Sequence, residues 1–228
     1  MYCTTCGAPL EAAARYCPKC GSLQSAPGPP PAAPVFAPRT GIRSDTGRWI
    51  GLGWDVVKND LGTFVLAGLI WIVLNSVVPI LLVGPLTAGF QVLCLNRLQG
   101  RRGELGDIFK GFDFFVPAML AGLLISVFVS VGALLCIIPG IVAAAVCQFA
   151  YLFVMDKRMD FWPAIQASYE IVRQDYFGFT MFVVALGLLN LLGALALVVG
   201  LLITVPLSMA ATAAAYRDIV GPAEAPAA

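Results

Sequence analysis

Four cysteines near the beginning of the chain are the residues whose type and spacing point most directly to chemistry. They form two C-x-x-C-G knuckles, and ten residues separate the first knuckle's second cysteine from the next knuckle. A tetrahedral Zn²⁺ ion takes four soft ligands, and two such knuckles supply them. The sequence therefore predicts a zinc ribbon over residues 1–22, and its metal ligands are Cys3, Cys6, Cys17 and Cys20.

The predicted zinc site is structural, because four protein ligands leave no coordination position open for a substrate. A module of this length cannot bury a core, so metal binding must supply its folding energy. Two alternatives stay open. One is a pair of disulfides, which a reducing cytoplasm disfavours. The other is an iron site of the rubredoxin type, although rubredoxin knuckles lie much further apart.

Catalytic chemistry has few candidates in this chain, which contains no histidine. Ser-His-Asp, Cys-His and histidine-metal mechanisms are therefore excluded. An enzyme acting on lipid phosphate would need a base such as Asp60, Asp113 or Asp175. Each of these carboxylates stands where a membrane helix is expected to begin, which favours a capping role. We expect no enzymatic activity and assign no catalytic residue.

The composition excludes a soluble monomer. Of 228 residues, 59% are hydrophobic and 12% are charged, and the mean hydropathy is +0.87. Average globular chains are about 45–50% apolar and about 25% charged, so this chain could not cover its surface in water. The net charge is only +1, which is too small for bulk charge to attract nucleic acid. No nucleic-acid partner is expected.

All 14 Lys and Arg and all 13 Asp and Glu avoid three long runs of 36, 42 and 41 residues, which are 61–96, 114–155 and 176–216. One spanning helix needs about 20 apolar residues, so each run has the length of two helices and a tight turn. Gly and Pro near the middle of each run predict the turns. The expected spanning helices are 61–81 and 85–98, 114–137 and 140–156, and 176–197 and 200–217.

Three hairpins place both termini and all charged segments on one side of the membrane. The connections on that side are rich in Lys and Arg, which favour the cytoplasm. Residues 1–21 are polar and lack the apolar segment of a signal peptide, so none is expected. The sequence predicts a multi-pass protein of the cell (inner) membrane with both termini cytoplasmic.

A short amphipathic segment precedes each predicted hairpin, at 48–58, 104–112 and 161–173. Apolar residues at helical spacing beside charges predict helices that lie in the membrane interface. The first and third segments also match residue by residue, since Trp54–Asp60 aligns with Tyr169–Asp175. We interpret the membrane domain as three copies of an interfacial helix followed by a hairpin. Convergent amphipathic composition is the alternative.

Residues 49–221 resemble a known group of membrane proteins. The resemblance rests on the turns Gly84-Pro85 and Pro139-Gly140, on the pair Gly111-Phe112, and on Ala164 with Ser168. The group consists of mostly uncharacterised bacterial six-helix proteins related to the membrane domain of glycerophosphodiester phosphodiesterases. The resemblance implies a fold and a membrane location. It implies no hydrolase activity, because the catalytic barrel of those enzymes has no counterpart here.

The predicted domains are therefore a zinc ribbon at 1–22, a Pro/Ala-rich linker at 23–46, a six-helix membrane domain at 47–220 and a disordered tail at 221–228. At about 3.1 Å per residue where it is polyproline II, the linker could hold the ribbon tens of ångströms from the membrane. The fold class is an all-α integral membrane protein with six transmembrane helices in three hairpins.

Polar residues within the runs have two interpretations. Interhelical hydrogen bonds are the expected role of five amides, which are Asn75, Gln91, Asn96, Gln148 and Asn190. A continuous polar cavity lined by four of them, without Asn96, would instead indicate a transporter or channel for a small uncharged or lipidic solute. The remaining cysteines, Cys94, Cys136 and Cys147, are interpreted as small apolar filler.

The function that this sequence favours is a membrane-anchored binding, scaffold or regulatory protein. Its expected partners are the lipid bilayer and a cytosolic protein that docks on the zinc ribbon. The transporter or channel is the alternative. Lys and Arg near the interfacial segments could also bind phospholipid headgroups. Salt bridges in the first and third segments are the simpler expectation, between Asp55 and Lys58 and between Glu170 and Arg173.

Overall fold

A computed structural model describes residues 6, 19–20, 41–77, 79–101, 103–135 and 137–221. The chain divides between Ala37 and Pro38 into two units, and each is described by itself. In the second unit the described residues form helices and no strand, which confirms the prediction of an all-helical body. The helices are α1 (Thr46–Asn59), α2 (Leu61–Val77), α3 (Pro79–Leu98), the 3₁₀ helix η1 (Leu105–Phe114), α4 (Phe115–Leu135), α5 (Ile137–Cys147), α6 (Ala150–Asp156), α7 (Phe161–Val172), α8 (Tyr176–Leu195) and α9 (Leu197–Val220).

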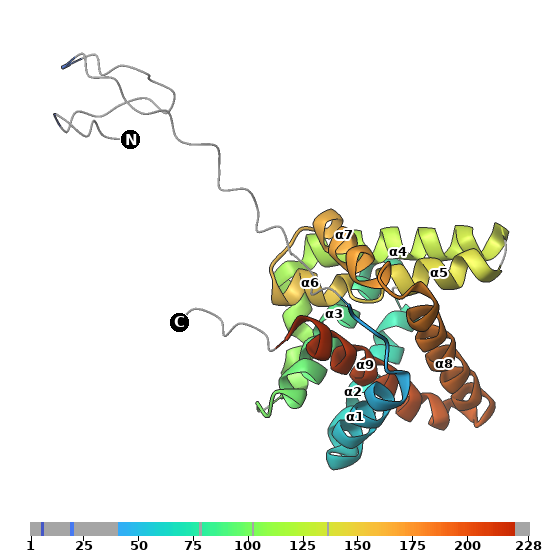
Figure 1. The fold of residues 1–228 in the computed structure, drawn as a ribbon. Coiled ribbons are helices and arrows are strands. Elements are labelled where there is room, and N and C mark those ends of the chain that lie inside the picture. Colours follow the sequence, from blue (N-terminus) through green and yellow to red (C-terminus); the bar gives the residue numbers. More distant parts are fainter. Residues whose placement is uncertain are drawn as a thin grey trace. The chain divides into compact units, whose positions relative to one another are not determined.

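One short helix and two longer ones follow each other at the start and the end of the body, as α1–α3 and α7–α9 (Figure 1). In between, η1 precedes α4 and the two shorter helices α5 and α6. The three predicted amphipathic segments are separate helices, namely α1, η1 and α7, although η1 is a 3₁₀ helix. The chain bends by 102° between α1 and α2. Asp45 accepts a hydrogen bond from the backbone N–H of Arg48 and so begins α1. A short helix lying across the start of a longer one is the arrangement expected for an interfacial segment.

Each run divides a few residues before the predicted break. The predicted breaks lie between 81 and 85, between 137 and 140, and between 197 and 200, whereas α3, α5 and α9 begin at Pro79, Ile137 and Leu197. Pro79 is the first residue of α3, where a missing N–H costs nothing because it would have no helical partner. Pro85 and Pro206 lie inside α3 and α9. The expected helices 85–98, 140–156 and 200–217 therefore begin earlier than predicted.

The glycines that were interpreted as turns instead permit close contact between helices. A Cβ atom on Gly84 would overlap the carbonyl oxygen of Ala118 on α4. A Cβ on Gly140 would lie 2.8 Å from the backbone nitrogen of Ala133, and one on Gly200 would overlap the carbonyl of Gly193. Small residues allow helices in membranes to approach backbone to backbone. Sequence alone does not distinguish this use of glycine from a turn.

The predicted helix 140–156 is divided into α5 and α6 by a side chain from another helix. Ser168 of α7 donates its hydroxyl hydrogen to the carbonyl oxygen of Val146 and accepts the N–H of Phe149 at 3.3 Å. Ser168 is completely buried. A side chain inserted between the hydrogen-bonded turns of a helix kinks that helix, so Ser168 accounts for the break at residues 148–149.

Replacing Ser168 by alanine is expected to destabilise this junction. The buried N–H of Phe149 and carbonyl of Val146 would both lose their partner, at a cost of about 1–3 kcal/mol. The apparent melting temperature of the purified protein in detergent measures the effect. Ser130→Ala, at an exposed position of α4, is the control and should leave the melting temperature almost unchanged. Equal effects of the two substitutions would contradict this account of the break.

The first and last helices pack against each other and close the body. Gly53 of α1 approaches α9 so closely that a Cβ would lie 2.7 Å from the backbone nitrogen of Ala211. The buried ring of Trp49 stacks on Phe179 at 5.8 Å between ring centroids and meets Phe182 edge-on at 5.2 Å. The alanines of α9 at 210, 211 and 213–215 are all buried, as expected for residues that allow close packing of helices.

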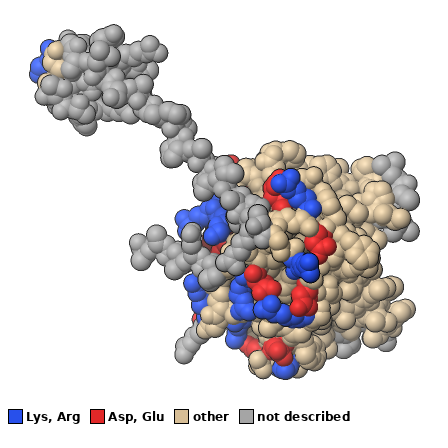
Figure 2. Space-filling view, viewed as in Figure 1, with Lys and Arg blue, Asp and Glu red and all other residues tan. Residues whose placement is uncertain are grey.

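Four stretches of the described residues are long and apolar enough to cross a membrane, and five are counted if the bent pair α1–α2 forms one span. They are Leu81–Leu98, Leu105–Leu134, Ile138–Asp156 and Tyr176–Leu195. Exposed leucines and valines are frequent on α2, α4 and α8. Figure 2 shows charged side chains gathered over part of the body and broad areas without charge. Six spans arranged as three hairpins remain a prediction.

Candidate metal centre and polar contacts between the helices

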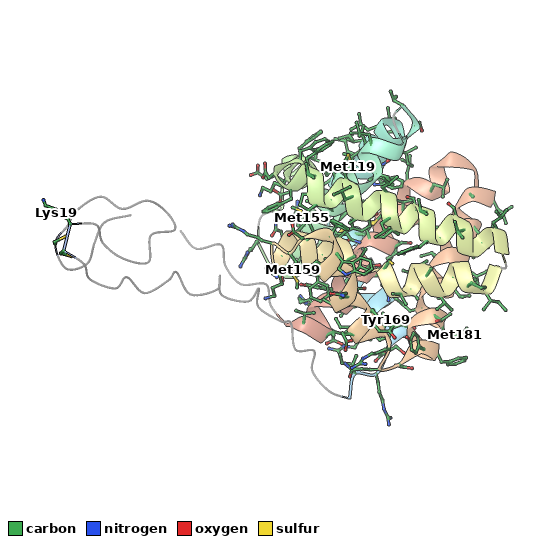
Figure 3. All side chains as sticks on the ribbon, turned by 90° about the horizontal axis from the view of Figure 1, so that it is seen from above. Lys19, Met119, Met155, Met159, Tyr169 and Met181 are labelled. Atoms are coloured by element: carbon green, nitrogen blue, oxygen red, sulfur yellow. The ribbon has the colours of Figure 1, made fainter. Side chains whose placement is uncertain are left out.

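The predicted metal centre lies in the first unit, of which the structure describes Cys6, Lys19 and Cys20. Cys6 and Cys20 are both exposed, and Lys19 and Cys20 lie in a turn, as expected for a knuckle (Figure 3). Cys3 and Cys17 lie outside the described residues. Within the described residues no three His, Cys, Asp or Glu side chains gather into a metal site. The geometry of the four-cysteine set therefore stays a prediction.

The chemistry of the donor set fits zinc. The four sulfur ligands are soft, and thiolates select Zn²⁺, Cu(I) or iron–sulfur clusters over hard cations such as Mg²⁺ and Ca²⁺. The chain has no histidine to replace one of them. A tetrahedral set of four thiolates is a closed structural site, and it would fold the ribbon around the ion.

Each short helix carries one salt bridge between residues three apart. The distances are 2.6 Å for Lys58–Asp55, 2.6 Å for Lys110–Asp107 and 2.7 Å for Arg173–Glu170. The salt bridges expected in the first and third segments are therefore confirmed, and the middle segment has one as well. The lysine and arginine side chains are about half exposed, so these pairs contribute little to stability.

Two of the three predicted capping carboxylates do cap helices. Asp60 accepts the N–H of Thr63 at 3.4 Å and binds Arg97 at 2.6 Å. Asp175 accepts the N–H of Gly178 at 3.0 Å at the start of α8. Asp113 instead lies in the last turn of η1, before α4 begins.

Asp175 also holds the segment that leads into α1. Its Oδ2 atom accepts the backbone N–H of Ser44 at 3.0 Å and the hydroxyl of Ser44 at 2.8 Å. These two bonds, with the N–H of Gly178, outweigh burial and lower the pKa of Asp175 below its ordinary value. Gly178 is required here, because a Cβ at this position would overlap the Ser44 hydroxyl. The α7–α8 corner is therefore fastened to the beginning of the helical body.

The lowered pKa of Asp175 predicts a pH dependence. Its folded value lies below the unfolded value of about 3.9, so its stabilising contribution is present above that pH. The contribution is lost as the pH falls through the folded pKa. Melting temperatures of the wild type and Asp175→Asn should differ by a constant amount near neutral pH. This difference should shrink in acid below about pH 4. A difference that grew in acid would contradict the assignment.

Three successive residues of α9 join it to three different helices, and the sequence analysis missed all of these contacts. The Tyr216 hydroxyl donates to Asp156 of α6 at 2.8 Å, and Arg217 donates to the carbonyl of Leu98 on α3. Asp218 accepts the indole N–H of Trp49 on α1 at 3.1 Å and pairs with Arg48. A Tyr-Arg-Asp run directly after the alanines, within the same helix, was the available signal.

Some of the amides within the charge-free runs form hydrogen bonds between helices. Asn190 donates to the carbonyl of Leu186 and to Ser208 of α9 at 2.8 Å, as predicted for an interhelical bond. Asn75 donates to the carbonyl of Trp71 in its own helix, and Asn96 donates to Asp107 of η1 at 2.9 Å. Among the described residues, oxygen atoms of Asn75, Gln91 and Asn190 and both polar atoms of Gln148 are buried without a hydrogen-bond partner.

The other cysteines agree with an apolar role where the structure describes them. Cys94 and Cys147 are buried among hydrophobic residues, and Cys147 contacts Ala150 and Ile165 in one cluster. Cys136 lies outside the described residues. These thiols are therefore part of the packing of the helical body.

Comparison with known proteins identifies the first unit. Residues 2–23 match the zinc-ribbon domain. This match covers all four predicted ligands, so the ribbon itself is established, whereas zinc is what domains of this type typically bind. No solved structure matches the chain.

The helical body has relatives in mycobacteria. Uncharacterised proteins of Mycobacterium bovis and of two strains of Mycobacterium tuberculosis are each 30% identical over 134 residues. These matches cover 59% of this chain and 41% of each relative, so the chain spans about two fifths of their length. None of these three relatives is described as related to the glycerophosphodiester phosphodiesterase membrane domain. The resemblance to that domain therefore stays a prediction.

Proposed function

We propose that this chain is a multi-pass protein of the cell membrane that presents a cytosolic zinc ribbon as a docking module for a protein partner. The observation that carries the proposal is a zinc-ribbon match at residues 2–23 on a chain whose charges all avoid three long runs. A closed metal site supplies rigidity rather than catalysis. The helical body then acts as the anchor, and the ribbon is the part that meets other proteins.

In this proposal one zinc ion is held by the four knuckle cysteines and, when bound, folds the ribbon. The chain's own contribution is the spacing of the thiolates and the residues exposed around them. Lys19 is exposed within the second knuckle and would belong to the docking surface.

The proposed topology has six spanning helices in three hairpins, with both termini in the cytoplasm. A charge at the centre of a bilayer costs at least about 2.5–3.5 kcal/mol, which explains why charges avoid the runs. The helices α2, α4 and α8 would enter the membrane, and α3, α5–α6 and α9 would return. Length supports this count, since α2 has 17 residues and α9 has 24, within or near the range that spans a bilayer.

Equivalent contacts support the proposal of three repeated units. The salt bridges of α1 and α7 both lie at the end of their short helix, whereas the pair in η1 lies near its start, so this correspondence holds for the first and third units. Asn75 and Asn190 lie 115 residues apart, the same spacing as Asp60 and Asp175, and each donates to the carbonyl four residues earlier.

The returning helices of the first and third units also correspond. Thr87 and Ser208 lie 121 residues apart, as do Pro85 and Pro206. Thr87 accepts the indole N–H of Trp71 at 3.2 Å, and Ser208 accepts the amide of Asn190 at 2.8 Å, so a polar bond joins the two long helices in each of these units. The donors differ, since Trp71 lies one turn before Asn75, the counterpart of Asn190.

A transporter or channel for a small uncharged or lipidic solute is the second candidate. The observation that favours it is the set of buried amide atoms of Asn75, Gln91, Gln148 and Asn190 that have no partner among the described residues. A pocket between α4, α5 and α8 is lined by apolar residues, and none of these amides reaches it. Solute uptake that is lost in Gln91→Leu but retained in the ribbon variants would favour transport over docking.

The docking role is tested by affinity purification from native membranes after cross-linking. The full-length wild type should retain protein partners that are lost when Cys3, Cys6, Cys17 and Cys20 are all changed to serine. Lys19→Glu, which leaves the ligands intact, should weaken capture by changing the charge of the exposed knuckle. Identical partners for the wild type and the four-serine variant would defeat the docking role.

A further inference from the structure

An apolar groove runs between α4, α5 and α8. Its volume is about 370 Å³, within the usual range for ligand sites of about 300–1,000 Å³. In Figures 1 and 3, α5 lies between α4 and α8, and Met181 marks α8 in Figure 3. The lining includes Ala133 of α4, Gly140 and Ala144 of α5, and Gly187, Leu188 and Leu191 of α8. The two outer helices are therefore walls, and α5 is the floor.

Small residues keep this groove open. A Cβ built on Gly187 would meet no atom within 4 Å, whereas one on Gly178 or Gly193 of the same helix would overlap neighbouring atoms. The space beside Gly187 is therefore not filled by any described helix of this chain. A gap of this size does not persist unfilled beside a dense medium, because its lining would lose its dispersion contacts.

The lining restricts the chemistry of the occupant to hydrocarbon. Every residue that lines the groove is apolar. A polar solute, a headgroup or a water molecule would find no hydrogen-bond partner there, and such burial is costly. An alkyl chain has no hydrogen bonds to lose when it enters the groove.

The position of the groove selects among hydrocarbon ligands, and this step rests on the membrane placement proposed above. The lining residues of α8 begin seven residues and end fifteen residues after its first residue, Tyr176. At 1.5 Å per residue the groove runs from roughly 10 Å to roughly 22 Å along α8, in a hydrocarbon core of about 30 Å. It therefore straddles the middle of the bilayer, with about 5 Å in the leaflet of the charged face and about 7 Å in the other leaflet.

The groove extends about 12 Å along α8 and is lined by apolar side chains alone. We propose that it binds one acyl chain of a membrane lipid.

Photo-cross-linking in vesicles of phosphatidylethanolamine and phosphatidylglycerol tests this proposal. The probe is phosphatidylglycerol with a diazirine in one acyl chain. In the wild type, the labelled peptides should concentrate on α5 and on the part of α8 around Gly187. Gly187→Phe fills the groove and should lower this labelling severalfold. Gly62→Phe, at an exposed glycine whose Cβ also meets no atom, is the matched control and should leave labelling unchanged.

Each other outcome overturns the proposal. Labelling spread evenly over all exposed helices would show ordinary bilayer contact, and unchanged labelling in Gly187→Phe would place the chain elsewhere. Protein–protein cross-links through α8 without lipid adducts would show that a second copy occupies the groove. Flotation of the protein with the vesicles is measured in the same samples. Loss of flotation would refute the membrane placement itself, whereas flotation without specific labelling refutes the acyl-chain site alone.

Discussion

Protein purified with its ribbon intact is expected to contain about one zinc ion per chain, and Cys3→Ser or Cys20→Ser should abolish that content. Structural zinc sites in small modules bind with apparent free energies of about 10–16 kcal/mol, because binding and folding are the same event. Losing one of four thiolates removes a ligand from a closed tetrahedral site. Elemental analysis of freshly reduced protein measures the effect.

The helical body should be unaffected by these substitutions, because the contacts that hold it lie within residues 41–221. The helical circular dichroism signal and its thermal transition should therefore match the wild type. Thr4→Ser, within the first knuckle but not at a ligand, is the matched control and should retain zinc. Iron in place of zinc, or metal retained in both cysteine variants, would contradict the assignment of the ligands.

Gly111→Ala should strongly destabilise the helical body. A Cβ on Gly111 of η1 would overlap the carbonyl oxygen of Pro85 on α3, and the nearest atoms beyond it also belong to the backbone. Backbone atoms cannot move aside as a flexible side chain can, so α3 and η1 must separate. Overpacking of this kind typically costs about 1–3 kcal/mol and sometimes more.

Gly106→Ala provides a control within the same short helix. A Cβ on Gly106 would meet no atom within 4 Å, so its substitution should change the melting temperature little. The two variants have the same chemistry and nearly the same position, and they differ only in the close contact with α3. If both were equally stable, close approach of η1 to α3 would not be what holds this part of the fold.

The positions of most helices could be predicted from the sequence because charge is so costly in a bilayer. Each charge-free run begins directly after an aspartate, which is Asp60, Asp113 or Asp175. The helices α2, α4 and α8 begin within two residues of these aspartates. The short helices could be predicted as well, since their apolar residues recur at helical spacing. The 3₁₀ geometry of η1 had no signal in that pattern.

The exact positions of the helix breaks could not be predicted, because glycine and proline have two uses. Gly84 and Gly140 bring helices into contact, and Pro79 begins a helix, so their presence does not fix the position of a turn. The division of α5 from α6 depends on Ser168, a residue from another helix.

The contacts that close the helical body also could not be predicted from the sequence pattern. Asp218 meets Trp49 across 169 residues, and Tyr216 meets Asp156 across 60. Such pairs follow from the tertiary arrangement and not from local periodicity. The zinc ligands, in contrast, lie close together in sequence, so the spacing of the cysteines was sufficient to predict the ribbon that the comparison identifies.

The topology of the helical body tests the account most directly, and labelling of introduced cysteines measures it. Val77, Leu134 and Leu195 lie at the ends of α2, α4 and α8 and are 72%, 89% and 74% exposed. Cysteines at these positions, in a background whose four ribbon cysteines and Cys136 are serine, should react with a membrane-impermeant maleimide on intact cells. A cysteine replacing Lys110 should react only after the membrane is permeabilised. If any of the first three reacted only after permeabilisation, or if Lys110→Cys reacted on intact cells, the three-hairpin topology with a cytosolic ribbon would be contradicted.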